Sequence, residues 1–530
     1  MITLSSLDYG LITFYFLIVF GLAFMVTGKK LSQDSEEYFL AGRNLGWFVV
    51  GASIFASNIG SEHLIGLAGS GATTGVIVAQ FELIACFVLL LLGWVFAPFY
   101  IKSGVVTMPE FLERRYSKAA RDYLTYVSII AYVLTKISVT IYAGSVLFES
   151  IGVSFWDGAL IVVIATGAYT IFGGLKAVIY TDMIQMIVMI IGATLVVYFG
   201  LDELGGLGEL KTTLSPSFFS MWRTMDDPSF PWTGVLFGAP ILGVWYWCTD
   251  QFVVQRVLSA KNIKEARKGT IFAGFLKVLP LYLFVFPGMI CFALAQKGVL
   301  VLDRSDQALP VLASYVLPNG LRGLFVAGLL AALMSSLSSV FNSCSTLVTY
   351  EIFKRKNPNL SERRLVQIGR LSTVGLVILG IAWIPMMKHI SGELFTYIQS
   401  VQAYISPPIA AVFFLGLFIK RINAKAAVTA LYAGLIIGVF RLVLEIQKDS
   451  IDGILLEFAS INFLHFAALL FLFVSILMIV ISFVTPKDDK DLSNVTYNGD
   501  MLKLMKGTKT EYILSILLVF TVLFIWWFYQ

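Results

Sequence analysis

Residues 50–69, VGASIFASNIGSEHLIGLAG, form an apolar run that polar residues and four glycines interrupt. Hydropathy places this stretch inside a membrane-spanning segment, although it contains Asn58, Glu62 and His63. A helix in lipid must satisfy its own backbone, so an interrupted polar segment is tolerated at that depth only where it lines a cavity or is buried in protein. Ionisable residues inside a membrane are costly and usually mark the path of a substrate or ion. The stretch therefore predicts a transporter.

The composition of the whole chain is that of a membrane protein with many spans. Of its 530 residues 58% are hydrophobic and 13% are charged, and the mean hydropathy is +0.84, far from the values of soluble domains. A hydrocarbon core about 30 Å thick takes roughly 20 apolar residues per helix, which predicts about fourteen spans here. The run at 310–350 is longer than one span, so we expect it to begin with a polar lead-in helix. The apolar runs fall near 8–27, 45–68, 76–101, 122–148, 157–173, 177–200, 232–255, 270–296, 310–350, 368–387, 394–419, 424–445, 460–484 and 511–529.

The basic residues follow the predicted membrane topology and do not indicate nucleic-acid binding. The net charge is +5, and most of the 38 Lys and Arg fall in alternate loops, including 113–121, Arg256 to Lys268, and Lys487 to Lys509. The positive-inside rule makes that side cytoplasmic and places both termini outside. We therefore expect a multi-pass protein of the plasma membrane, or of the inner membrane in a bacterial cell, with the lipid bilayer and no nucleic acid as partner.

The chain offers little for enzymatic or metal chemistry. It has three histidines, and Glu62-His63 lacks the second histidine of a zinc-protease motif. Its four cysteines show no CxxC spacing and are interpreted as small buried hydrophobes. Because no nucleophile–base pair or metal set can be assembled, we expect a protein that is not an enzyme.

Charged and aromatic residues inside the predicted spans favour a neutral polyol as ligand. Glu82 and Lys277 lie in different spans, and because each is expensive in lipid we expect them to pair or to share a polar ligand. The aromatic run 245–247, WYW, has polar residues on both flanks. Such rings cover the apolar face of a sugar, while fixed donors and acceptors satisfy its hydroxyls. Other ionisable residues in predicted spans are Lys136, Asp182 and Asp250.

A cluster of serines in LLAALMSSLSSVFNSCST is a candidate sodium site. Ser335, Ser336, Ser338 and Ser339 are crowded within about one helical turn in apolar surroundings. A single hydroxyl can bond back to its own helix at little cost, but four together are harder to explain in that way. Na⁺ is a hard cation, and hydroxyls together with the carbonyls of an unwound helix can supply its oxygen ligands. The interrupted second span is the expected source of those carbonyls.

Seven motifs together resemble the sodium–glucose (galactose) cotransporter branch of the sodium/solute symporter family. The similarity runs from about residue 36 to residue 425, and the two interrupted spans, the second and the seventh, begin the two halves of the family's core. The motifs are FLAGR, VGASIFASNIGSEHLIGLAGSGA, VIYTDMIQ, WYWCTDQFVVQRVLSAKN, FLK, LMSSLSSVFNS and YIQSVQAYISPPIAAVF.

The resemblance implies an all-α integral membrane protein with a LeuT-like fold, in which two five-helix repeats of inverted topology form the core. The whole chain, 1–530, would be a single transmembrane transporter domain. Its parts would be an extra N-terminal helix at 1–35, the first inverted repeat at 36–200, the second at 230–420, and C-terminal extra helices at 424–530.

The resemblance also implies roles for individual residues in holding a sugar. Tyr246 would stack under the sugar as an inner gate, and Gly243 stands where sugar-binding relatives often carry Asn or Thr. The outer apolar gate would consist of Leu67, Phe81 and Phe395. The sugar would be held by Asn58, His63, Glu82, Tyr246, Trp247, Lys277 and Gln399.

The same resemblance implies a principal Na⁺ site and, as in some members, a second one. Glu62 receives no role. The principal site would use the carbonyls of Ala56, Ile59 and Ala332 and the hydroxyls of Ser335 and Ser336. The second would use Asp182, Ser338 and Ser339.

Together these observations predict a Na⁺-coupled symporter that imports a neutral monosaccharide, glucose or galactose, by alternating access. Its partners would be a small sugar and Na⁺ as the co-transported ion. Two alternatives stay open, a Na⁺-coupled carrier of myo-inositol or another polyol, and a sugar sensor on the same scaffold that does not transport.

Overall fold

The computed structural model describes residues 4–27, 34–60, 62–137, 140–141, 144, 148–149, 152–387 and 394–530. The side chains of 62, 134–135, 383–387 and 394–398 lie outside this description. Within the described residues the chain is helical, and only two isolated β-bridges and no β-strand occur. The prediction of an all-α protein is confirmed.

The described helices in the first half of the chain are mostly short, and α1 and α10 are the long ones. They are α1 (Ser6–Thr27), α2 (Ser35–Leu40), η1 (Ala41–Arg43), α3 (Trp47–Asn58), η2 (Glu62–Leu67), α4 (Ala68–Thr74), η3 (Gly75–Ala79), α5 (Gln80–Leu91), η4 (Leu92–Phe96), α6 (Ala97–Ser103), α7 (Met108–Arg115), α8 (Lys118–Ala131), η5 (Tyr132–Ile137), α10 (Phe155–Leu204), α11 (Leu207–Thr213), η6 (Pro216–Phe219), α12 (Trp232–Phe237), α13 (Ala239–Gly243), η7 (Val244–Thr249) and α14 (Gln251–Leu258).

The second half contains more of the long helices. They are α15 (Ile263–Leu276), η8 (Leu281–Val285), α16 (Phe286–Gln296), η9 (Ser305–Gln307), α17 (Ala308–Val316), α18 (Leu321–Leu347), η10 (Val348–Lys354), α19 (Glu362–Met387), α20 (Leu394–Phe418), α21 (Ala424–Ile446), η11 (Lys448–Ser450), α22 (Gly453–Ser460), α23 (Phe463–Val484), α24 (Gly499–Met505) and α25 (Lys509–Phe528).

Ten helical segments of the described chain are long and apolar enough to cross a membrane. One of them, α10, contains the predicted runs 157–173 and 177–200 as two helices that meet at a kink at Gly174, where φ is 57° and ψ is −158°. The short helix α17 leads into α18, as expected for the run at 310–350, although its sequence ALPVLASYV is mostly apolar. The number of about fourteen spans therefore stays a prediction.

The predicted interruption of the second span is confirmed. The helix α3 ends at Asn58, Ile59 is extended with φ −75° and ψ 101°, and η2 begins at Glu62. The last carbonyls of a helix have no partner within that helix. The break therefore places backbone oxygens in the middle of the protein, where a cation can use them.

The seventh predicted span is interrupted in the same way. Asp250 is extended, with φ −76° and ψ 128°, and it separates η7 from α14. Its carboxylate accepts a hydrogen bond from the backbone N–H of Phe252 at 3.1 Å, and so it caps the start of α14. The second and the seventh predicted spans are thus both broken helices.

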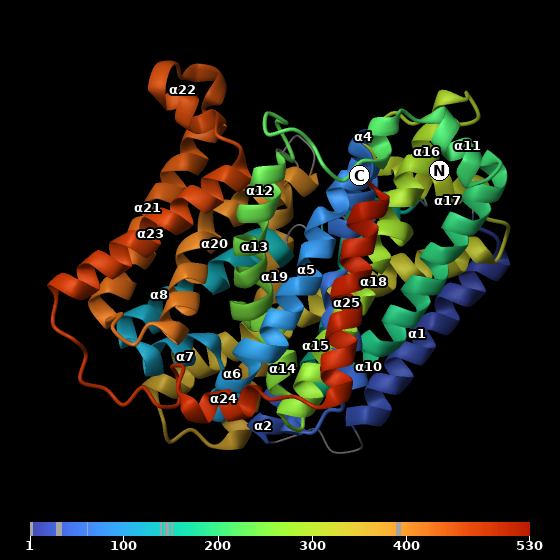
Figure 1. Cartoon of the computed structure of the whole chain (residues 1–530). Helices are drawn as coiled ribbons and strands as arrows, with labels where there is room; N and C mark the ends of the chain where they lie inside the picture. The colour runs from blue at the N-terminus through green and yellow to red at the C-terminus, as the bar shows by residue number, and fades with distance from the viewer. Residues whose placement is uncertain are drawn as a thin grey trace.

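Short helices lie at two opposite ends of the molecule. Figure 1 shows α11, α12 and α22 at the upper end and α2, α7 and α24 at the lower end. Near the start of α1, Asp8 accepts hydrogen bonds from the backbone N–H groups of Gly320 and Gly323 at the beginning of α18. Just after α25, the carbonyl of Tyr529 accepts one from Met221, in the loop before α12. Figure 1 marks both ends of the chain in the upper part of the molecule, so the start of α1 and the end of α25 lie at the same end.

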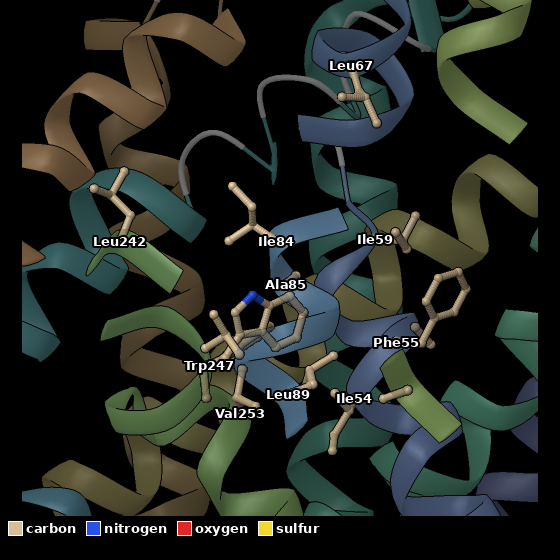
Figure 2. Packing of buried hydrophobic residues seen from close by; sticks show 14 of the residues in the cluster. Ile54, Phe55, Ile59, Leu67, Ile84, Ala85, Leu89, Leu242, Trp247 and Val253 are labelled. Atoms are coloured by element: carbon tan, nitrogen blue, oxygen red, sulfur yellow. The ribbon is translucent and has the colours of Figure 1, made fainter. Parts of the chain in front are cut away.

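The two broken helices pack into the centre of the protein. Ile54, Phe55 and Ile59 of the first break are fully buried, and Trp247 of the second is 5% exposed. Figure 2 shows these side chains, with Leu67, Ile84 and Leu242 above Trp247 in that view. Long helices surround this centre: α10 packs on α3 and α18, and α3 packs on α15.

Candidate functional site

Four polar residues from three parts of the chain meet in one buried cluster. The ammonium of Lys277 donates hydrogen bonds to Asn58 Oδ1, at 2.5 Å, and to Glu82. The Nε2 atom of His63 lies 3.2 Å from Glu82 Oε1 and 3.5 Å from Lys277 Nζ. None of the four is more than 8% exposed. The expectation that Glu82 and Lys277 pair is confirmed.

The ends of helices position this cluster. Asn58 is the last residue of α3, Glu82 lies in the first turn of α5, and Lys277 follows the last turn of α15. A helix dipole favours an anion near its N-terminus and a cation near its C-terminus. The backbone therefore stabilises both Glu82 and Lys277 where they stand.

The Nδ1 atom of His63 is the unsatisfied group of this cluster. It is buried and meets no hydrogen-bond partner among the residues that the structure describes. A buried polar atom without a partner costs about 1–3 kcal/mol. His63 lines the pocket described next, so its ring is among the groups that a ligand there would contact.

Aromatic side chains of η7 form a second wall. The hydroxyl of Tyr246 accepts a hydrogen bond from Asn58 Nδ2 at 3.0 Å, and its ring lies 5.0 Å from the ring of Trp247. Lys277 Nζ lies 5.3 Å from the Trp247 ring. Six of the seven residues expected to hold the sugar line a single pocket, namely Asn58, His63, Glu82, Tyr246, Trp247 and Gln399. Lys277, 1% exposed, contacts the pocket through Asn58 and Glu82.

The residues expected to form the outer gate differ in their placement. Phe81 lines the pocket, and its ring lies 6.1 Å from that of Phe230 and 6.4 Å from that of Phe463. Leu67 is fully buried and is not part of the pocket lining. The side chain of Phe395 lies outside the described residues. Gly243 lines the pocket, so no side chain contacts a ligand at that position.

The structure brings the broken helix α3 against the serine face of α18. A Cβ on Gly60 would lie 3.0 Å from the hydroxyl of Ser336, which shows how closely the break approaches α18. Ala56, Ile59 and Ala332 are all buried, at 2% exposure or less, and Ser335 is fully buried. Four of the five residues expected to hold Na⁺ are therefore buried, and Ser336 is half-buried beside the break.

Asp182 organises the neighbouring serines. This fully buried carboxylate accepts hydrogen bonds from Ser53 and Ser335, each at 2.6 Å. Because the Ser335 hydroxyl donates its hydrogen bond to Asp182, the lone pairs of its oxygen can face a cation. Ser338 donates to the carbonyl of Ser335 at 3.0 Å.

The prediction that Arg256 lies in a cytoplasmic loop is wrong. Arg256 is fully buried on α14, and its guanidinium lies 3.5 Å from Asp182. It also donates hydrogen bonds to Ser53, at 2.8 Å, and to Ser339. The expected second ion site is therefore already neutralised by a side chain. The apolar continuation of WYWCTDQFVVQRVL past Asp250 was the sequence signal for this burial.

Broken helices, buried opposite charges and an oxygen-rich break together define a membrane transporter with a central binding site. The sequence model of the Sodium:solute symporter family matches residues 38–438. This chain belongs to that family.

Curated relatives are similar over nearly all of the chain. Sodium/glucose cotransporter 4 of Mus musculus is 39% identical and aligns with 93% of this chain and 78% of its own length. Sodium/glucose cotransporter 1 of Oryctolagus cuniculus is 38% identical, with 91% and 79% covered. The sodium/myo-inositol cotransporter of Homo sapiens is 37% identical, with 93% and 75% covered.

Solved structures confirm the fold class. A Na⁺-coupled sialic acid symporter in its substrate-bound outward-open state has a TM-score of 0.79 at 20% identity, with 91% of this chain and 99% of that chain covered. Mhp1, a nucleobase-cation-symport-1 family transporter, has a TM-score of 0.51 at 14% identity, with 88% and 97% covered. The chain is a multi-pass membrane protein with the LeuT-like fold, and Na⁺ is its co-transported ion.

Proposed function

We propose that this Na⁺-coupled symporter imports a neutral monosaccharide, glucose or galactose, by alternating access. The observation that carries the proposal is the pairing of Glu82 with Lys277 beside the pocket. Because the two charges cancel, the pocket offers strong hydrogen-bonding groups without a net charge. A ligand rich in hydroxyls and without charge fits such a site, and two of the similar relatives are sodium/glucose cotransporters.

Each pocket residue has a separate role in this proposal. Glu82 accepts hydrogen bonds from sugar hydroxyls, and His63 accepts or donates them. Asn58 and Lys277 also bind the sugar, and they hold the hydroxyl of Tyr246 and the carboxylate of Glu82 in place. The amide of Gln399 hydrogen-bonds to sugar hydroxyls, and the indole of Trp247 covers the apolar face of the sugar ring. Phe81, together with Leu67 and Phe395, closes the outer side of the pocket.

Na⁺ is proposed to bind where the break in α3 meets α18. Its ligands are the carbonyls of Ala56, Ile59 and Ala332 and the hydroxyls of Ser335 and Ser336. Na⁺ bound there holds α3 against α18, and since Asn58 is next to this break, the same ion orders a sugar-binding residue. Coupling then follows from the higher affinity of both ligands for one conformational state.

We propose separately that a second Na⁺ binds for each sugar, on the condition that Arg256 makes room for it. Asp182, Ser338 and Ser339 are its candidate ligands, but Arg256 neutralises Asp182 and donates to Ser339. A second cation at this carboxylate must displace that guanidinium. The ratio of Na⁺ to sugar taken up by the same vesicles decides between one ion and two.

Myo-inositol is the second candidate substrate. It is also a neutral six-membered ring with hydroxyls, and a sodium/myo-inositol cotransporter is almost as similar to this chain as the glucose carriers are. A sugar sensor without transport is the remaining alternative. No enzymatic reaction is proposed.

The topology proposed for the plasma membrane has both termini outside. It is supported by the common placement of the start of α1 and the end of α25, opposite to the basic loops near α7 and α24 (Figure 1). The parts proposed within the single domain are 1–35, 36–200, 230–420 and 424–530. The broken helices near the start of the second and third parts support these boundaries.

Uptake by proteoliposomes tests the function and the substrate. Labelled glucose, galactose and myo-inositol are offered separately, each with an inward Na⁺ gradient and with K⁺ in its place. Glucose or galactose should accumulate with Na⁺ and not with K⁺. Accumulation of myo-inositol alone favours the second candidate, sugar-induced currents without accumulation favour the sensor, and equal uptake with K⁺ contradicts Na⁺ coupling.

A further inference from the structure

An ion pair joins the first half of the core to the second below the sugar pocket. In η5, the ammonium of Lys136 donates a hydrogen bond to Asp250 Oδ2 at 2.7 Å. The hydroxyl of Tyr132, one turn earlier, donates to the other oxygen of the same carboxylate. The side chain of Lys136 is 10% exposed and that of Asp250 is 3% exposed. The pair is therefore almost dry, although neither residue lines the pocket.

The ammonium of Lys136 lies between aromatic rings. Its Nζ atom is 4.5 Å from the ring centroid of Tyr246, 4.2 Å from that of Phe252 and 5.2 Å from that of Tyr132. A cation within about 6 Å of a ring face is attracted to it, and more strongly where water is excluded. Lys136 thus contacts the ring of Tyr246 directly.

Tyr246 is held from two directions. On the pocket side its hydroxyl accepts a hydrogen bond from Asn58, and Lys136 lies over its ring. Asp250 follows η7 and begins α14, which runs toward the lower end of the molecule in Figure 1, where the basic loops lie. The ion pair therefore lies between the sugar pocket and the proposed cytoplasmic side.

We propose that Lys136 is the positioning residue of the inner gate. Its ion pair with Asp250 fixes Tyr246 beneath the sugar and must separate before the sugar can leave toward the cytoplasm. Lys136 belongs to the first repeat and Asp250 to the second, and alternating access moves one part of such a fold against the other. A contact across that boundary stabilises one state only and shifts the balance between the two states.

This inference rests on the proposed role of Tyr246 as the inner gate of a Na⁺-coupled sugar carrier. Loss of the pair should let the gate open without Na⁺ and should loosen Tyr246. A residue needed only for folding would lower the amount of active protein instead, without changing how uptake depends on Na⁺ or on sugar concentration.

The experiment compares Lys136→Gln, Asp250→Asn and the double variant with the wild type in proteoliposomes. Lys136→Arg is the matched control, since it keeps both the ion pair and the cation–π contacts. Labelled sugar uptake is measured in Na⁺ and in K⁺, and KM and the maximal rate are determined in saturating Na⁺.

We expect Lys136→Gln to raise the ratio of sugar uptake in K⁺ to sugar uptake in Na⁺ at least fivefold, because one charged hydrogen bond is lost. The sugar KM should rise as well. Lys136→Arg should keep both wild-type values. The double variant should match the worse single variant, because both single changes remove the same contact.

Wild-type Na⁺ dependence and KM in Lys136→Gln, or effects that simply add in the double variant, would overturn the inference. If Lys136→Gln does not fold, Asp250→Asn decides, because Asn is nearly isosteric and still caps α14. If the wild-type protein shows no Na⁺-stimulated sugar uptake, the proposed function itself is wrong. If the wild type shows Na⁺-stimulated uptake and the variants behave like the wild type, only the proposed role of Lys136 is wrong.

Discussion

Replacement of Glu82 by Gln tests the charged cluster beside the pocket. The change keeps the shape of the side chain and its ability to hydrogen-bond, but it removes the negative charge. Lys277, which is 1% exposed and donates to Glu82 and Asn58, then keeps an uncompensated positive charge in a dry place. His63 loses its contact with a carboxylate as well.

The expected magnitudes follow from these contacts. Removal of one partner of a buried ion pair costs about 3–5 kcal/mol in the free energy of unfolding, so the melting temperature of Glu82→Gln should fall. A hydrogen bond from a sugar hydroxyl to a charged group contributes about 1.5–3 kcal/mol. Its loss corresponds to a rise of roughly 10- to 150-fold in the sugar KM.

Two measurements on purified protein check these values. Thermal unfolding in detergent gives the stability, and labelled sugar uptake in saturating Na⁺ gives the KM. The control is Glu82→Gln combined with Lys277→Met, which removes both charges and should recover stability but not uptake. Glu82→Gln with the melting temperature and KM of the wild type would refute the reasoning.

Three further substitutions test the other parts of the site. Gln399→Ala should raise the sugar KM by up to about tenfold, the cost of one neutral hydrogen bond, with the Na⁺ dependence unchanged; an unaltered KM removes Gln399 from the sugar site. Ser336→Ala should raise the Na⁺ concentration needed for half-maximal uptake, and a titration with wild-type midpoint contradicts the sodium assignment. Asp182→Asn should raise the same midpoint, because Ser335 loses its charged acceptor. If paired flux measurements show that it also lowers the Na⁺ to sugar ratio from two to one, then Asp182 binds a second ion despite Arg256.

The break in α3 could be predicted because its causes are local. Glycines and polar residues near Asn58 weaken the helix at a depth where lipid would not tolerate free backbone groups. The need of Glu82 and Lys277 for a partner was also predictable, since a charge inside an apolar span is costly unless an opposite charge or a polar group neutralises it. Both inferences needed residue types and approximate depth, but no knowledge of packing.

The surroundings of Asp182 could not be predicted in the same way. Arg256 follows an apolar turn but precedes a basic loop, so the sequence alone allows it to lie on either side of the membrane boundary. Its burial is decided by α3 and α18, which bring Ser53 and Ser339 to the guanidinium. Contacts between such distant segments depend on the tertiary arrangement.

The sequence also did not show which of the expected residues line the pocket. Phe81 and Gln399 line the pocket, but Leu67 is buried outside its lining. The two predicted runs on either side of Gly174 are two helices joined at a kink without a loop, because glycine adopts the positive φ that redirects the chain there. Periodicity identifies the apolar segments, but it does not show how neighbouring segments connect.

Accumulation of labelled sugar against its own gradient tests the central claim most directly. Proteoliposomes that contain the purified protein receive an inward Na⁺ gradient and equal sugar on both sides. We predict that glucose or galactose rises inside above its outside concentration, and that a sodium ionophore abolishes this rise. Equal sugar concentrations on both sides throughout, or a rise that persists after the Na⁺ gradient has collapsed, would contradict a Na⁺-coupled sugar symporter.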